Sequence, residues 1–367
     1  MSTRTKGDPA KVWLVPHPGE DLQEWLDERH MSIKEFAIKS GKPEKTIIAV
    51  TKGHSSITPD MAIAFEMVSG VPASYWLNRQ RGYDEFEARK KRESVLHIAS
   101  DWARQFPYSA MTKLGWVPDT RSSTERAQNL LLFFGLTSPE AWENYYLRST
   151  LPTAFRISLK HSHNPAAISA WLRKGESDAG DLHCAEFDKV KLRAALPWFK
   201  GLMANPPKDW FIQLQEACLE CGVKLVHTPC LPKAPVNGAV RHVGSAALIQ
   251  ISGRQNRYDI FWFTFFHEVG HLLLHGTKDI FIDGDEVGNV GGVADKEREA
   301  DDFAVRWTLS VEEEEQLMST VKIEQGYLNR ISRKLGTHPS IIVGRMHHTG
   351  RLHPSRGRDF LKTLEFC

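Results

Sequence analysis

Two histidines and a glutamate within FFHEVGHLLLHG have the residue types and the spacing of a metal site. His267 and His271 are four residues apart, so on a helix they project from one face, one turn apart. Two imidazoles at that spacing can take adjacent corners of a zinc tetrahedron, and Glu268 can reach a water on the metal without being a ligand. Zinc makes that water easier to deprotonate, and Glu268 can take its proton as the water attacks a carbonyl. The pattern predicts a hydrolytic zinc site in which His267 and His271 are ligands and Glu268 is the general base.

A third protein ligand is expected from the acidic segment EREADDFA. At about 100° per residue, Glu297 and Glu299 lie on opposite flanks of the apolar stripe of this helix, so helical geometry alone does not choose between them. We favour Glu297, because Asp301 follows it one turn later and can support a histidine ligand by hydrogen bonding. A third histidine ten residues after His267 would be a different ligand set, but that position is Thr277.

The elements that must hold these residues can be read from the surrounding pattern. The segment IFWFTFFHEVGHLLLHG predicts a buried helix, with Asp259 as its cap and Gly276 after it. Three short strands are expected before it, in KLVHTPCL, GAVRHV and SAALIQIS. A glycine-rich loop, GDEVGNVGGVAD, separates it from the acidic helix. In the alternative interpretation the two histidines are core residues bonded to backbone carbonyls and the glutamate is a solvated charge.

A second functional pattern lies near the start of the chain, in SIKEFAIKSGKPEKTIIAVTKG. Ser32 and Glu35 form a capping box, Gly41 ends the first helix, and Pro43 opens a second one. From Ser32 to His54 there are five lysines against two glutamates, an excess that suits phosphate contact. The segment predicts a DNA-binding helix-turn-helix, and the alternative is a small helical bundle whose lysines are solvated.

A helix-turn-helix places the start of its second helix against base edges in the major groove. Glu44, Lys45 and Thr46 are therefore the expected base readers, and Ala49 could contact a thymine methyl group. The residues expected to contact bases or backbone are Lys42, Glu44, Lys45, Thr46, Ala49, Lys52 and Ser55.

Length and composition are those of a globular protein with more than one domain. The chain has 367 residues, of which 41% are hydrophobic and 25% charged, with a net charge of +2. The near-neutral charge does not exclude a basic nucleic-acid-binding face. The start of the chain lacks the apolar stretch of a secretory signal, and the richest apolar run is too short to span a bilayer. We expect a cytoplasmic protein without a membrane partner.

The middle of the chain predicts helices but no function. Residues 86–205 have a mostly helical pattern, and Asn205-Pro206-Pro207 is the clearest break after it. Cys218 and Cys221 form a C-x-x-C pair with no second pair to complete a zinc site, so we interpret them as residues of a helix end. The predicted domains are residues 1–85, an all-α helix-turn-helix domain, residues 86–205, a helical middle, and residues 206–367, an α+β domain.

Two family resemblances add to these interpretations. Residues 14–85 resemble the HigA-type antitoxin and repressor family through LQEWLDERHMSIKEFA, SGKPEKTI, SSITPDMA and GVPASYWLNRQ. Residues from about 206 to 350 look like the ImmA/IrrE metallopeptidases through FWFTFFHEVGHLLLHG, EREADDFA and LGTHPSIIVGRMHH. The second resemblance implies a zincin-like fold, a gluzincin-like Zn2+ site with His267, His271 and Glu297 as ligands, and Glu268 as general base. It also implies a substrate class, because the members of this family cleave helix-turn-helix repressors.

The chain departs from both families in one place each. After the Phe-Ala pair it has VRWTLS, where the metallopeptidases usually run into Leu-Leu-Met-Pro. We expect this to change packing near the substrate cleft and to leave the ligands intact. The segment IIAVTKG lacks the second polar cluster of many HigA relatives, which bears on the strength of DNA binding.

Three functions are compatible with these patterns. In the first, a homodimer binds operator DNA and cleaves a repressor or antitoxin protein, which derepresses genes. In the second, the chain is an antitoxin-like repressor whose peptidase fold senses or docks without turnover. In the third, a general peptidase uses the helix-turn-helix only to dimerise.

Overall fold

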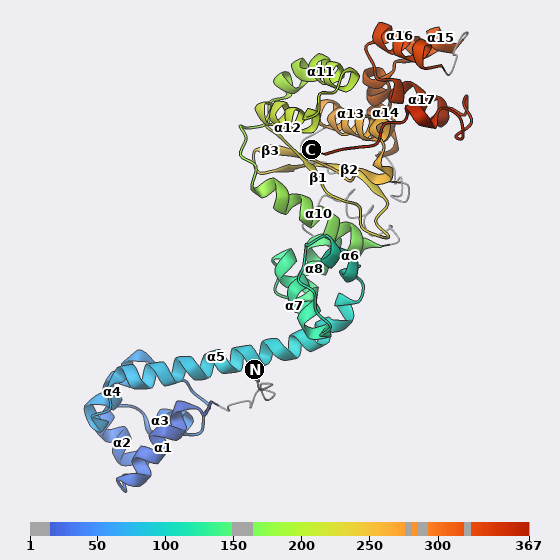
Figure 1. Cartoon of the computed structure of the whole chain (residues 1–367). Coiled ribbons are helices and arrows are strands. Elements are labelled where there is room, and N and C mark those ends of the chain that lie inside the picture. The colour runs from blue at the N-terminus through green and yellow to red at the C-terminus, as the bar shows by residue number, and fades with distance from the viewer. Residues whose placement is uncertain (1–14, 149–163, 276–280, 285–292, 319–323, 367) are drawn as a thin grey trace, which may run out of the picture. The chain divides into compact units, whose positions relative to one another are not determined.

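A computed structural model describes residues 15–148, 164–275, 281–284, 293–318 and 324–366 (Figure 1). The chain divides into two compact units, Met1–Ile98 and Ala99–Cys367, and the division falls within helix α5 (Ala73–Ala103). The boundary predicted after residue 85 lies within the same helix. The boundary predicted after residue 205 lies between two helices that share one core, described below. The three-domain division stays a prediction.

The first unit is a bundle of short helices followed by the start of α5. Ser32 accepts a hydrogen bond from the Glu35 amide, so the predicted N-cap is confirmed, and Thr58 caps α4 in the same way through the Met61 amide. Gly41 has a φ of 65°, which favours glycine at the end of a helix. The helices before α5 are α1 (Pro18–Glu28), α2 (Ile33–Ser40), α3 (Glu44–Thr51) and α4 (Pro59–Ser69).

A small aromatic core holds this bundle together. Phe36 on α2, Phe65 on α4 and Trp76 on α5 are buried and meet edge to face, with ring centroids 5.2 and 5.8 Å apart. Ile47 and Val50 bury one face of α3 in the same cluster. The opposite face of α3 is therefore left to solvent.

The second unit begins with helices and continues into a four-stranded sheet. Its strands are β1 (Val223–His227), β2 (Val236–Val243), β3 (Ala246–Ile251) and β4 (Phe281–Gly284), in the order β1-β3-β2-β4. β1 and β3 are parallel, and the other two pairs are antiparallel. The three strands predicted from the sequence are confirmed, and β4 is an addition to them.

Helices cover both faces of the sheet (Figure 1). Gln250 of β3 donates to the Trp171 carbonyl of α10 (Pro165–Gly180), so one face packs against that helix. Ile249 and Ile251, which point the other way, belong to the main core with α11 (Lys189–Ala204), α12 (Trp210–Glu220) and α13 (Tyr258–Leu274). The helices before α10 are α6 (Tyr108–Lys113), α7 (Ser123–Phe134), α8 (Pro139–Trp142) and the π-helix Glu143–Arg148.

The buried helix predicted around the two histidines is α13, and the acidic helix is α14 (Val293–Thr308). The residue predicted to cap α13 does not do so: Asp259 lies inside the helix and pairs with Arg257, which is the N-cap. Gly276 lies outside the described residues. The chain continues through α15 (Val311–Met318), α16 (Gln325–Leu335) and α17 (Pro339–His348).

The C-x-x-C pair lies at the end of α12, as expected. Cys218 is inside the helix, Cys221 is its C-cap, and both are buried free thiols in the main core. Among the described residues, no helix combines the length and the apolar character that crossing a membrane would need.

Candidate metal centre

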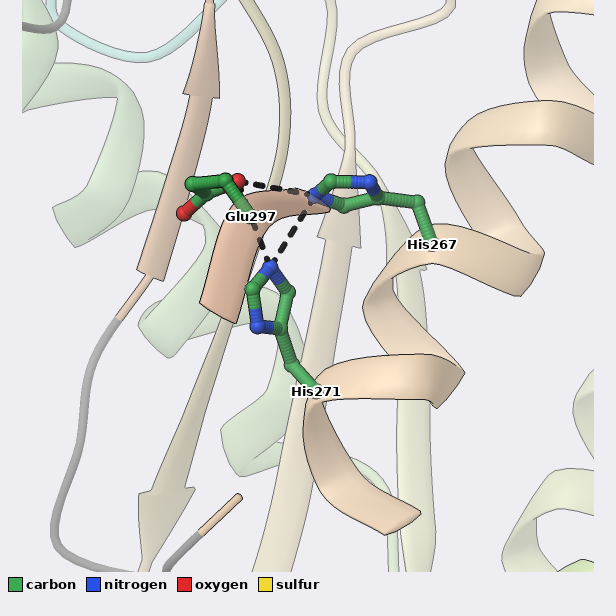
Figure 2. Close-up of side chains that lie close together, drawn as sticks. All are labelled: His267, His271 and Glu297. Atoms are coloured by element: carbon green, nitrogen blue, oxygen red, sulfur yellow. Dashed lines mark hydrogen bonds and ion pairs between the residues drawn. The ribbon is translucent and has the colours of Figure 1, made fainter. Parts of the chain in front are cut away.

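Two helices bring three potential ligands together (Figure 2). His267 and His271 point from successive turns of α13, and their Nε2 atoms are 3.0 Å apart. Oε2 of Glu297 on α14 lies 3.2 Å from Nε2 of His267 and 3.5 Å from Nε2 of His271. A zinc tetrahedron with metal–ligand distances of about 2.0–2.1 Å has ligand atoms about 3.3 Å apart. The three side chains therefore have a spacing that a single zinc ion fits.

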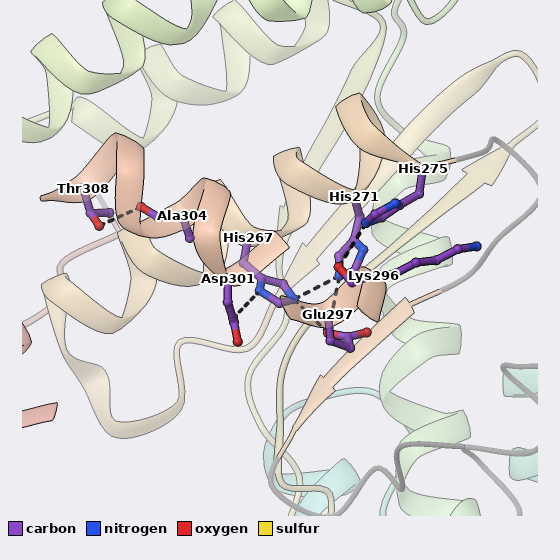
Figure 3. Close-up of polar contacts among 8 residues, drawn as sticks. All are labelled: His267, His271, His275, Lys296, Glu297, Asp301, Ala304 and Thr308. Carbon is purple, nitrogen blue, oxygen red and sulfur yellow. Dashed lines mark hydrogen bonds and ion pairs between the residues drawn. The ribbon is translucent and has the colours of Figure 1, made fainter. Parts of the chain in front are cut away.

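Helical geometry alone did not choose between Glu297 and Glu299, but the contacts of α14 distinguish them. Glu299 extends toward a different histidine, with its Oε2 atom 3.7 Å from Nδ1 of His275. Asp301 lies 2.9 Å from Nδ1 of His267, on the ring edge opposite the cluster (Figure 3). A carboxylate at Nδ1 orients the ring and leaves Nε2 to face the metal position. The structure thus brings Glu297 into the cluster, Asp301 behind it, and Glu299 outside it.

The ionisation of the cluster suits a metal. Burial is the main cause that lowers the pKa of His271 to about 4, against an opposing hydrogen bond with Glu297. Burial alone raises the pKa of Glu297, but hydrogen bonds with His267 and His271 outweigh it and lower the pKa to about 2. At neutral pH, His271 is therefore neutral and Glu297 is ionised, which are the forms that bind zinc.

The residue predicted to be the general base is buried against the sheet. Glu268 has no solvent-exposed surface, and its carboxylate approaches Gly238 on β2. A Cβ atom at Gly238 would lie 2.3 Å from Oε1 of Glu268 and 2.7 Å from Cγ2 of Thr264. Only a glycine leaves room at this point of the strand for the carboxylate as it stands.

The sequence predicted β2 as a strand but not its approach to Glu268. Val236 pairs with Gly284 and Gly238 with Asp283, so Asn237 is an extra residue that forms a bulge between β2 and β4. Neither the bulge nor the contact with Glu268 has a local sequence pattern, because both depend on pairing with a distant strand. The glycine in GAVRHV was the one hint, since a glycine inside a strand often marks close approach or a bulge.

The predicted DNA contacts lie on and around α3 in the first unit. Lys45, Ala49 and Lys52 are spaced along one side of the helix, opposite its buried residues, and both lysines are exposed. Glu44 begins the helix and is exposed, and Thr46 and Ser55 are partly exposed. Pro43, which the sequence predicted to open the helix, is its N-cap, and the helix begins one residue later at Glu44.

One of the predicted phosphate contacts has a partner within the protein. Lys42 forms an ion pair with Asp60 at the start of α4, and only 18% of its side chain is exposed. This pair neutralises much of the charge that a phosphate contact would use. Lys45 and Lys52 are the more accessible cations of this surface.

The comparisons with known proteins concern the N-terminal region. The chain is 37% identical over 75 residues to YddM of Escherichia coli (strain K12), an uncharacterized HTH-type transcriptional regulator; the match covers 20% of this chain and 80% of that protein. An antidote protein of a plasmid maintenance system from Nostoc punctiforme is 33% identical, with 22% of this chain and 87% of that chain covered and a TM-score of 0.21. An addiction module antidote protein of a HigA family from Coxiella burnetii is 32% identical, with 23% and 91% covered and a TM-score of 0.21. No family model matches the chain.

These similarities concern about a fifth of the chain. The N-terminal region resembles an HTH-type transcriptional regulator in sequence. The reported matches cover 20 to 23% of the chain and leave the metal centre to be judged by its geometry.

Proposed function

Because the chain belongs, through its N-terminal region, to the family of HTH-type transcriptional regulators, we propose that it is a DNA-binding regulator with zinc-dependent endopeptidase activity. In this proposal a cytoplasmic homodimer binds operator DNA through α3. Its second unit, an ImmA/IrrE-like zincin, cleaves a helix-turn-helix repressor or antitoxin, and gene expression follows from the loss of that protein.

The observation that carries the peptidase proposal is the convergence of His267, His271 and Glu297. Two imidazoles and one carboxylate are the donor set of one class of catalytic zinc sites, which keeps its fourth position open. Their ligand atoms all lie within 4.8 Å of one another although the residues come from two helices. Core histidines bonded to backbone carbonyls, the alternative interpretation, would not require a carboxylate between them.

The residues around the cluster have complementary parts in peptide hydrolysis. Zinc, when bound by the three ligands, would act as a Lewis acid and make water more acidic. Asp301 holds the ring of His267 in one orientation. Glu268 is next to a ligand on the same helix and would accept the proton of the attacking water and pass it to the leaving amine. Its burial excludes bulk water from that exchange.

The first test is the zinc content of the purified full-length protein. We expect about one zinc per chain in the wild type, and a large loss in His271→Ala and Glu297→Ala. Glu299→Ala is the matched control, because it removes a carboxylate two residues from Glu297 that lies outside the cluster. A wild-type protein without tightly bound zinc, or equal loss in the Glu299 variant, would overturn the proposed ligand set.

A second function is a HigA-like antitoxin or repressor in which the peptidase fold only senses or docks. The relatives of the N-terminal region favour it, because YddM is described as a transcriptional regulator and the protein from Coxiella burnetii as an addiction module antidote. Glu268→Gln separates the two functions in cells. Loss of derepression with operator binding retained supports the peptidase, and an unchanged phenotype supports the repressor without turnover.

A further inference from the structure

A cleft of about 720 Å³ opens in the second unit along helix α13, on the side where the helix begins. Phe263 forms part of its wall, and the ring of Phe263 lies 6.5 Å from that of His267. Thr308, at the end of α14, lines it too, on the helix that carries Glu297 and Asp301 (Figure 3). Two of the helices that line the cleft, α13 and α14, therefore also carry the candidate metal ligands.

One wall of the cleft lies a helical turn away from Glu268. Thr264 lines the cleft and lies one helical turn before Glu268, and the methyl group of Thr264 and the carboxylate of Glu268 both face Gly238. Asn237, the bulged residue beside Gly238, also lines the cleft. A bulge next to a functional site commonly redirects a side chain, and here the bulged Asn237 lines the cleft beside the glycine that Glu268 faces.

The charges around the cleft are predominantly positive. Arg257 is neutralised by its ion pair with Asp259. Arg345 lies 2.9 Å from Glu314, but Glu314 also pairs with Arg351 at 3.2 Å, so that group keeps one net positive charge.

Arg358 supplies a second positive charge, at the rim of the cleft. Arg358 is exposed and uses its Nε atom to donate to the Pro354 carbonyl, and among the described residues no carboxylate pairs with it. Its terminal N–H groups are therefore not held by an acidic side chain of the described residues and can serve an external carboxylate.

The walls between these charges are apolar. Ile260 and Phe263 on α13 face Ile341 on α17 and Leu361 near the end of the chain. Apolar walls with a few placed polar groups are typical of sites for side chains or small organic ligands, and a volume of about 300–1,000 Å³ is usual for such sites. A phosphate backbone would leave these walls uncovered, so polypeptide is the better match.

We propose that this cleft binds an acidic, extended segment of the polypeptide substrate, adjacent to the peptide bond whose attacking water Glu268 would deprotonate. The assignment of the ligand as substrate rests on the proposed peptidase function. Arg358 and the Arg345–Glu314–Arg351 group hold the acidic side chains, and the apolar walls hold the residues between them. The substrate class is thus narrowed to proteins with acidic residues on one side of the cleaved bond.

Binding can be measured without hydrolysis in the full-length Glu268→Gln protein. The probe is a fluorescein-labelled peptide of repeating Gly-Asp-Ser-Glu units, followed by fluorescence anisotropy, with a Gly-Lys-Ser-Lys peptide as comparison. We expect the acidic peptide to bind at least about tenfold more tightly than the lysine peptide. Arg358→Glu, added to the same protein, is expected to weaken acidic-peptide binding about tenfold, and Arg358→Lys much less.

Arg330→Glu is the matched control, because Arg330 is an exposed arginine on α16 that does not line the cleft. Equal binding of the two peptides, or the same affinity in the Arg358→Glu and Arg330→Glu proteins, would overturn the proposal. Displacement of the acidic peptide by inorganic phosphate or single-stranded DNA as effectively as by unlabelled peptide would overturn the choice of polypeptide.

The peptide-binding experiment and the zinc measurement test the two proposals separately. If the wild type holds no zinc but the acidic peptide binds in an Arg358-dependent manner, the peptidase proposal fails and the cleft remains an acidic-peptide site. If zinc is present and peptide charge has no effect, the cleft proposal alone fails.

Discussion

The contact between Gly238 and Glu268 makes a quantitative prediction for Gly238→Ala. The added Cβ would lie 2.3 Å from Oε1 of Glu268 and 2.7 Å from Cγ2 of Thr264. Ordinary contacts begin about 1 Å further out, so the glutamate or the strand must move by about that amount. Overpacking of this kind costs about 1–3 kcal/mol, and we expect the second unit to lose stability by that order.

A double-mutant cycle identifies which side chain is responsible. Glu268→Ala removes the carboxylate that collides, so Gly238→Ala should cost less in that background, by about 1 kcal/mol or more. Part of the cost should remain, because the β-branched Thr264 side chain is stiff and is still present. The free energies come from urea unfolding of the full-length proteins, followed in the transition of the second unit.

Gly326→Ala supplies the reference for an uncrowded glycine. A Cβ there meets no atom within 4 Å, and the residue lies within α16, so alanine should stabilise the protein by about 0.5–1 kcal/mol. If Gly238→Ala costs the same with and without the Glu268 side chain, or behaves like Gly326→Ala, then the buried carboxylate does not lie against β2 and the reasoning is wrong.

Three further predictions concern other parts of the chain. Asp301→Ala should weaken zinc binding by about 10- to 100-fold, measured by competition with a chelator, and Asp302→Ala on the same helix is its control. Lys45→Ala should weaken operator binding and lower the slope of log K against log salt by about 1, whereas Lys39→Ala, whose side chain pairs with Glu35 on α2, should change it less. Burial, together with Lys362, lowers the pKa of His338 to about 4. Folding therefore favours the neutral form of His338. The contribution of His338 to the free energy of unfolding should be full above pH 6.5 and should fall by roughly 1–3 kcal/mol as the pH drops toward 4. The His338→Asn variant should show a flatter pH dependence when denaturation is measured across that range.

Local patterns in the sequence were enough to predict most of the elements and two of the three candidate ligands. The i, i+4 spacing of His267 and His271 sets two imidazoles on one helical face wherever the helix lies, because helical pitch is a local property. Ser32 and Gly41 mark the ends of α2 for the same reason, through a cap and a left-handed residue whose partners are a few positions away. The three strands before α13 were likewise predictable from alternating or continuous apolar runs.

Which carboxylate joins the histidines, and what faces Glu268, depend on the tertiary structure. Glu297 and Glu299 are equivalent by helical geometry, and the way α14 packs against α13 puts one in the cluster and the other beside His275. β4, the bulge at Asn237 and the approach of Gly238 to Glu268 all depend on pairing or packing between residues far apart in the chain. Such contacts leave no periodic trace in the sequence, because pairing register and interhelical packing are set by the whole core and not by neighbouring residues.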